Sequence, residues 1–168
     1  GHSRLITNGL SDNQPISNDQ VAIIHNGIIL NHEKIWKTLS QKRELEIDTE
    51  ILNALYSEYS DKNLSLDKIF SKIGKLCKGV VACAFLIPKI GKLCLFSNNG
   101  SLYLGEKEGD YIFASEKNTL SSIGCLSIQQ IRNLEILDIP KSDFPFEIVE
   151  KKISRANFLK SLSKDKEE

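Results

Sequence analysis

The sequence predicts an α+β fold in which helices pack on antiparallel sheets. Helical spacing of apolar residues dominates positions 33–76, whereas short apolar runs separated by turn residues follow Gly79. Those turns are long enough to join antiparallel neighbours but too short for the crossover connection between parallel strands. Helices that lie together on strongly apolar antiparallel strands form a layered α+β domain.

Three helices are predicted in the first half of the chain. The first covers residues 33–40. Asp48 is a natural N-cap for the second helix, Ser65 could cap the third, and Gly79 ends the third. Their apolar faces consist of Ile35, Trp36 and Leu39, then Ile51, Leu52, Leu55 and Tyr59, and finally Leu66, Ile69, Phe70, Ile73 and Leu76.

Short strands are predicted on both sides of these helices. The apolar run at residues 21–25 indicates a buried strand, which Asn26 and Gly27 end in a sharp turn. After Gly79, further strands are predicted at residues 80–87, 92–96, 102–105, 111–114 and 135–139.

The composition indicates one neutral domain. The chain has 168 residues, 40% of them hydrophobic, and 22 basic residues balance 22 acidic ones. A zero formal charge argues against a nucleic-acid partner. We expect a domain at residues 1–150 and a charged tail or linker at residues 151–168.

The four cysteines indicate a reducing environment. Cys77, Cys83, Cys94 and Cys125 form no CxxC pair, and no histidine lies at ligand spacing from them. Scattered cysteines of this kind predict neither a metal site nor a disulfide framework. No apolar run is long enough for a membrane span. The sequence therefore favours a cytoplasmic protein with no metal, no cofactor and no membrane partner.

Three polar segments could carry chemistry. Arg4 and Thr7 lie in a loop closed by glycine, and an arginine fork with a nearby hydroxyl suits a carboxylate. The amide of Asn26 beside the N–H of Gly27 could form an oxyanion hole. The Asp48 carboxylate could pair with a substrate ammonium. Each segment also has an ordinary interpretation: a surface ion pair for the arginine, a turn for Asn26 and Gly27, and a helix cap for the aspartate.

In this order the segments resemble the glutaminase domain of class II glutamine amidotransferases, of the glucosamine-6-phosphate synthase type. Residues 25–33 read HNGIILNHE and resemble the family pattern HNGIIxNHE. Residues 1–9 resemble GHTRxxTxG, and residues 48–50 match DTE. Leu5, Asn8 and Ser97 depart from the family, which indicates a divergent member.

The resemblance implies a four-layer αββα sandwich with antiparallel sheets. It implies that Arg4 and Thr7 bind the α-carboxylate of L-glutamine and that Asp48 holds its α-ammonium. Asn26 and the N–H of Gly27 would form the oxyanion hole. Ammonia released from glutamine would pass to an acceptor domain or subunit in amino-sugar or surface-polysaccharide synthesis, and a homodimer is compatible with this family.

The family also implies a nucleophile. Its members use a cysteine at the mature N-terminus, whose own α-amino group serves as the base. None of the four internal cysteines has such an amine, so we expect the nucleophile and the first strands to lie upstream of Gly1 and these 168 residues alone to be inactive. The alternative is a degenerate module that binds glutamine or a partner without catalysis.

Overall fold

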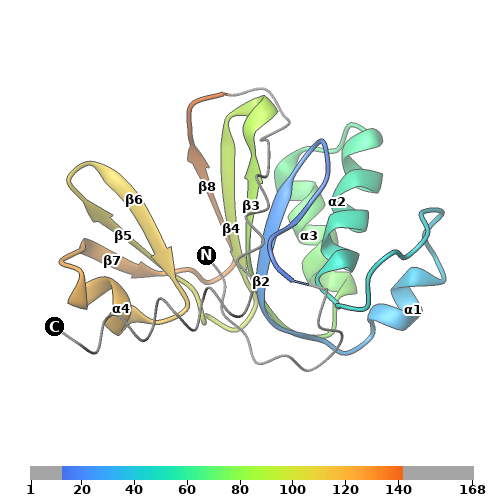
Figure 1. The fold of residues 1–168 in the computed structure, drawn as a ribbon, viewed down its shortest axis with the longest axis horizontal. Coiled ribbons are helices and arrows are strands. Elements are labelled where there is room, and N and C mark those ends of the chain that lie inside the picture. The colour runs from blue at the N-terminus through green and yellow to red at the C-terminus, as the bar shows by residue number, and fades with distance from the viewer. Residues whose placement is uncertain (1–12, 142–168) are drawn as a thin grey trace, which may run out of the picture.

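The computed structural model describes residues 13–141, which form two antiparallel sheets and four α-helices (Figure 1). Arg4 and Thr7 lie outside the described residues, as does the tail boundary at residue 150. The elements are β1 Ile16–Ser17, β2 Ala22–Ile29, α1 His32–Trp36, α2 Glu50–Asp61, α3 Leu66–Leu76, β3 Gly79–Ile87, the 3-10 turn η1 Pro88–Ile90, β4 Lys92–Ser97, β5 Tyr103–Lys107, β6 Asp110–Ala114, α4 Lys117–Ser122, β7 Leu126–Gln130 and β8 Leu134–Asp138.

The larger sheet has the strand order β1-β2-β3-β4-β8, and the smaller sheet has the order β6-β5-β7. Figure 1 shows α2 and α3 side by side against one face of the larger sheet, while β5, β6 and β7 lie beyond its other face with α4 beside them. This is the predicted α+β sandwich of antiparallel sheets.

Strand β3 explains how the sheet supports two cores. Its residues alternate in direction, as in any strand. Val81, Cys83 and Phe85 pack with the helices, where the ring of Phe85 meets that of Phe70 edge-on at 4.8 Å between centroids. Ala82 and Ala84 pack in a second core that reaches the smaller sheet. A strand buried on both faces reads as a continuous apolar run, which is why β3 was predictable.

Several elements differ from the sequence prediction. The predicted turn at Asn26 and Gly27 is wrong, because β2 runs through both residues to Ile29 and pairs with β3 throughout. Helix α1 is shorter than predicted and ends at Trp36. The short strand β1, helix α4 and strand β7 were not predicted. The last two read KNTLSS and LSIQQ, and these have too few apolar residues to show a period.

Within residues 13–141, no helix is long and apolar enough to cross a membrane. The same residues contain no group of three or more His, Cys, Asp or Glu side chains that could hold a metal ion.

Candidate functional site

Gly27 lies where β2 and β3 approach each other too closely for a side chain. A Cβ atom at this position would be 2.0 Å from the carbonyl oxygen of Val80 and 2.9 Å from Nε2 of His25. Its φ of +149° also lies in a region that residues with side chains rarely adopt. Only glycine fits here without a shift of the main chain. Gly27 is therefore needed for the close pairing of β2 with β3 and not for a turn.

Asn26 faces a cavity of about 290 Å³ between the two sheets. Its neighbour across the strand pair is Ala82, which belongs to the core shared with the smaller sheet. The cavity walls come from β2, β3, and the segments around Ser101 and Phe113. The amide of Asn26 therefore lies at the exposed rim of a cavity that is large enough for a small polar ligand.

The hydrogen bonds of β2 alternate between its two edges, and this alternation decides where the N–H of Gly27 points. The N–H of His25 donates to Oε1 of Gln14 at 2.5 Å, and the N–H of Ile29 donates to Oδ2 of Asp48 at 2.7 Å. Both groups are on the edge opposite β3. Because the direction repeats every second residue, the N–H of Gly27 points to this same edge. On this edge the pairing with β1 stops at Ile23, so among the described residues no strand pairs beside Gly27.

Asp48 does not cap α2 with its side chain, so that prediction is wrong. The helix begins at Glu50, and Thr49 occupies the N-cap position without a side-chain cap bond. The Asp48 carboxylate instead turns to the end of β2, where it accepts the N–H of Ile29. A backbone donor two residues beyond Gly27 thus fixes one carboxylate oxygen. The Asp48 side chain remains 23% exposed, and its other oxygen lies 4.0 Å from Nδ1 of His25.

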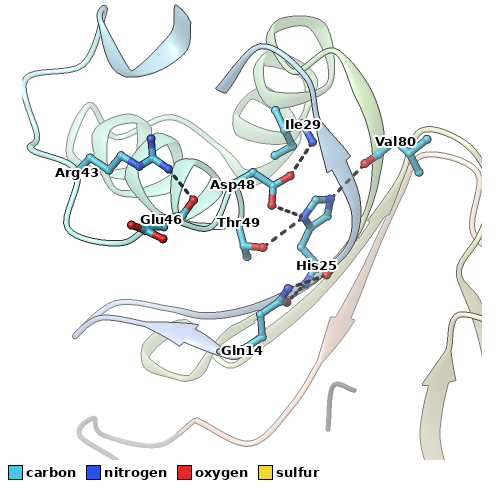
Figure 2. A network of polar contacts seen from close by, with 8 residues as sticks. All are labelled: Gln14, His25, Ile29, Arg43, Glu46, Asp48, Thr49 and Val80. Atoms are coloured by element: carbon cyan, nitrogen blue, oxygen red, sulfur yellow. Dashed lines mark hydrogen bonds and ion pairs between the residues drawn. The ribbon is translucent and has the colours of Figure 1, made fainter. Parts of the chain in front are cut away.

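The two residues after Asp48 hold other segments in place, and Figure 2 shows the first of them, Thr49, beside His25. The hydroxyl of Thr49 lies 3.3 Å from Nδ1 of His25. The buried carboxylate of Glu50 accepts the N–H groups of Glu44 and Leu45 at 2.8 and 3.0 Å. Asp48 and Thr49 therefore contact β2, whereas Glu50 contacts the preceding loop, so the DTE motif joins the start of α2 to both.

Arg43 completes the support of that loop. Its Nε donates to the carbonyl of Leu45 and its Nη2 to the carbonyl of Glu46, each at 2.6 Å. The guanidinium thus ties together the turn that leads into Asp48, as Figure 2 shows for the contact with Glu46. A rigid fork of donors can serve two carbonyls at once.

Gln14 takes the place of a strand on the open edge of β2. Its Oε1 accepts the N–H of His25, and its Nε2 donates to the carbonyl of the same residue at 3.0 Å. Sequence reasoning did not identify Gln14, His25, Thr49 or Glu50 as site residues. His25 lies in the motif HNG, and Thr49 and Glu50 lie in the motif DTE, so their place in these motifs could have identified them. Nothing in the sequence distinguished Gln14.

The described cysteines are all buried. Burial raises the pKa of Cys77 and of Cys94 to about 12, and it raises that of Cys83 well above its usual value. The thiolate is the nucleophilic form of cysteine, so thiols held neutral in this way react slowly.

The structure therefore brings Asn26, Gly27 and Asp48 together around one end of β2. The carboxylate and the glycine N–H lie on the same edge of β2, and the buried imidazole of His25 lies beside the carboxylate. Arg4 and Thr7 lie outside the described residues.

Comparison with known proteins identifies the relatives of this chain. The model of a family described as a glutamine amidotransferase domain matches residues 2–122. The isomerizing glutamine–fructose-6-phosphate aminotransferase of Helicobacter pylori is 27% identical over 183 residues, which cover 98% of this chain and 30% of that protein. The enzyme of the same name from Staphylococcus aureus is 27% identical over 85% of this chain and 25% of that protein. The chain thus spans under a third of the length of these relatives.

Solved structures show the same fold. The glutamine phosphoribosylpyrophosphate amidotransferase of Bacillus subtilis, in complex with ADP and GMP, superposes with a TM-score of 0.68 at 20% identity and covers 88% of this chain and 35% of that one. A structure described as the allosteric regulatory enzyme of purine biosynthesis superposes with a TM-score of 0.63 at 19% identity, covering 80% of this chain and 32% of that one.

Proposed function

The chain belongs to the glutamine amidotransferase domain family, and from this premise we propose that it binds L-glutamine, releases ammonia from the side-chain amide and supplies it to an acceptor domain or subunit. The observation that supports this most directly is the edge of β2. There, the N–H of Gly27 points away from β3, as do the N–H of His25 and the N–H of Ile29 that holds Asp48.

The spacing on that edge suits an amino acid of this length. Two residues along a strand span about 6.6 Å. A ligand whose ammonium meets Asp48 could therefore place its side-chain carbonyl near Gly27. Asp48 has an oxygen available for this contact, because Ile29 occupies only Oδ2. We propose that Arg4 and Thr7 bind the α-carboxylate, which would complete the recognition of glutamine.

The chemical step requires stabilisation of a negative oxygen. When a nucleophile adds to the carboxamide, the carbonyl oxygen gains charge, and two preorganised donors then contribute more than they do to the neutral amide. The side-chain amide of Asn26 and the N–H of Gly27 are the donors that we assign to this oxygen. When the tetrahedral intermediate collapses, the amide nitrogen takes up a proton and leaves as ammonia, and the glutamyl group stays bonded to the nucleophile. Water then hydrolyses that acyl bond and releases glutamate.

We further propose a sugar phosphate as the ammonia acceptor. Two relatives that match most of this chain carry the name glutamine–fructose-6-phosphate aminotransferase. The match covers under a third of those relatives, so we propose that the acceptor binds to a part of the protein outside the matched domain. The cytoplasmic location and the homodimer remain predictions of the sequence.

The test is steady-state glutaminase kinetics on the full-length protein, with and without fructose 6-phosphate. Asn26→Ala should lower kcat by about 10²–10³ with little change in KM, because its amide acts mainly on the charged intermediate. Asp48→Asn should raise KM instead, since the ammonium is bound equally before and during the reaction. Asn118→Ala and Asp110→Asn, which change exposed residues of α4 and β6, are the matched controls.

The outcomes separate the two parts of the proposal. No glutamate release by the wild-type protein would favour the non-catalytic module and contradict the hydrolase. Glutamate release without a hexosamine phosphate product in the presence of fructose 6-phosphate would retain the glutaminase and exclude this acceptor. An Asn26→Ala enzyme with raised KM and unchanged kcat would refute the oxyanion assignment.

A further inference from the structure

The imidazole of His25 lies between the two halves of the candidate site. The residue is 2% exposed and sits on β2 directly before Asn26. Its Nε2 lies 3.2 Å from the carbonyl oxygen of Val80, and its Nδ1 lies 3.3 Å from the hydroxyl of Thr49. A carbonyl oxygen can only accept, so Nε2 carries a proton and donates it to β3. The ring thereby joins β3 to the start of α2.

One end of the ring is next to Asp48 and the other is next to Gly27. At the Nδ1 end, Oδ1 of Asp48 is 4.0 Å away. At the Nε2 end, a Cβ on Gly27 would be 2.9 Å from the nitrogen, and the Val80 carbonyl that accepts its proton would be only 2.0 Å from that Cβ. The imidazole therefore lies between the Asp48 carboxylate and the Val80 carbonyl, as Figure 2 shows. Its Nε2 end is also where Gly27 approaches β3.

The main chain of His25 is held as firmly as its ring. Both its N–H and its carbonyl are bonded to the side-chain amide of Gln14. This contact fixes the histidine along the edge on which the N–H of Gly27 also points. A residue whose main chain and ring are both held can fix the position of its neighbours in the strand.

One hydrogen bond alone does not set the position of Asp48. The bond from Ile29 to Oδ2 leaves the carboxylate free to turn about that oxygen. The contact between the Thr49 hydroxyl and the His25 ring is a second attachment, at the residue next to Asp48. Two attachments fix the orientation of Asp48 and Thr49 relative to β2.

We propose that His25 and Thr49 are positioning residues that set the separation between the Asp48 carboxylate and the N–H of Gly27. This inference rests on the proposed glutamine site and extends it to two residues that do not touch the substrate. Thr49 orients the histidine ring, the ring spaces the carboxylate from the glycine, and the spacing matches the site to the two ends of glutamine.

The experiment compares Thr49→Val with Thr49→Ser in the full-length protein. Valine has the same shape as threonine but lacks the hydroxyl, whereas serine retains the hydroxyl. Thr49→Val should raise KM for glutamine by about tenfold, the size expected for the loss of one hydrogen bond. Its kcat should stay within about twofold, because a misplaced carboxylate weakens binding before and during the reaction equally. Thr49→Ser should restore KM, and Thr119→Val, on the exposed part of α4, is the matched control.

Hydrogen exchange supplies a second readout that does not depend on activity. The amide of Ile29 is protected by Asp48, so a carboxylate that has lost its second anchor should allow faster exchange at Ile29 in Thr49→Val but not in Thr49→Ser. Protection of the amides in β4 should be unchanged in both variants. This pattern separates a local loss of position from a general loss of stability.

The inference and the proposed function fail in different ways. A wild-type protein that releases no glutamate, or an Asp48→Asn variant with unchanged KM, refutes the proposed function. An active wild type whose KM rises in Asp48→Asn but not in Thr49→Val refutes the positioning role. It is also refuted if serine fails to restore KM, or if exchange at Ile29 is unaltered by valine.

Discussion

Gly27→Ala should destabilise this domain more than the same change at Gly109 or Gly124, where φ is also positive but a Cβ would meet nothing within 4 Å. The new Cβ would lie 2.0 Å from the Val80 carbonyl oxygen and 2.7 Å from its carbon. Both atoms are main chain in β3, so neither can rotate away. We expect about 1–3 kcal/mol from the overpacked contact. A further 1–3 kcal/mol or so comes from placing a side chain at a φ of +149°.

Gly109→Ala separates these two contributions. Gly109 has a φ of +88° in the turn between β5 and β6, and a Cβ there would meet nothing within 4 Å. Its substitution therefore has only the backbone cost, so we expect the two variants to differ by about 1–3 kcal/mol.

The assay is hydrogen exchange across a denaturant series in the full-length protein, which reports the free energy of unfolding for the amides of β2 and β3. Equal losses of unfolding free energy in Gly27→Ala and Gly109→Ala would refute the close approach. So would a Gly27→Ala variant that kept the wild-type exchange rates in β3.

Three other changes test the remaining contacts. Glu50→Gln should lower the free energy of unfolding by about 1–3 kcal/mol, because the NH₂ group that replaces one carboxylate oxygen cannot accept a hydrogen bond and leaves one of the two backbone N–H groups unpaired. Glu106→Gln, at an exposed position of β5, should have no comparable effect in the same denaturation experiment. Gln14→Glu should increase hydrogen exchange at the start of β2, since a carboxylate cannot donate to the carbonyl that Nε2 now contacts. Burial raises the pKa of Cys77 and Cys94 from 9.0 to about 12, so the folded state retains both protons where the unfolded chain loses them. Stability should therefore fall as pH rises from 9 towards 12, by about 1.4 kcal/mol per pH unit for each thiol. A flat unfolding free energy over this range, measured by denaturant titration, would contradict the assignment.

The sequence alone determined the features that depend on neighbouring residues. Helix α3 and strands β3 and β4 were predictable because their apolar periodicity and flanking turn residues lie within each segment. The family was also recognisable, since HNGIILNHE and DTE are contiguous. What each motif residue does was less accessible, because its partner lies elsewhere in the chain.

Tertiary structure decided the features that depend on distant partners. Asn26 and Gly27 have the local preference of a turn, yet pairing with β3 extends them into a strand, because the ladder satisfies their backbone groups and buries the flanking side chains. Asp48 has the local preference of a helix cap, yet the N–H of Ile29, 19 residues earlier, binds its carboxylate. Local preferences amount to about 1 kcal/mol, so a satisfied backbone group and a packed strand outweigh them. The position of the His25 ring also depends on distant partners. The ring contacts Thr49 and Val80, which lie 24 and 55 residues further along the chain.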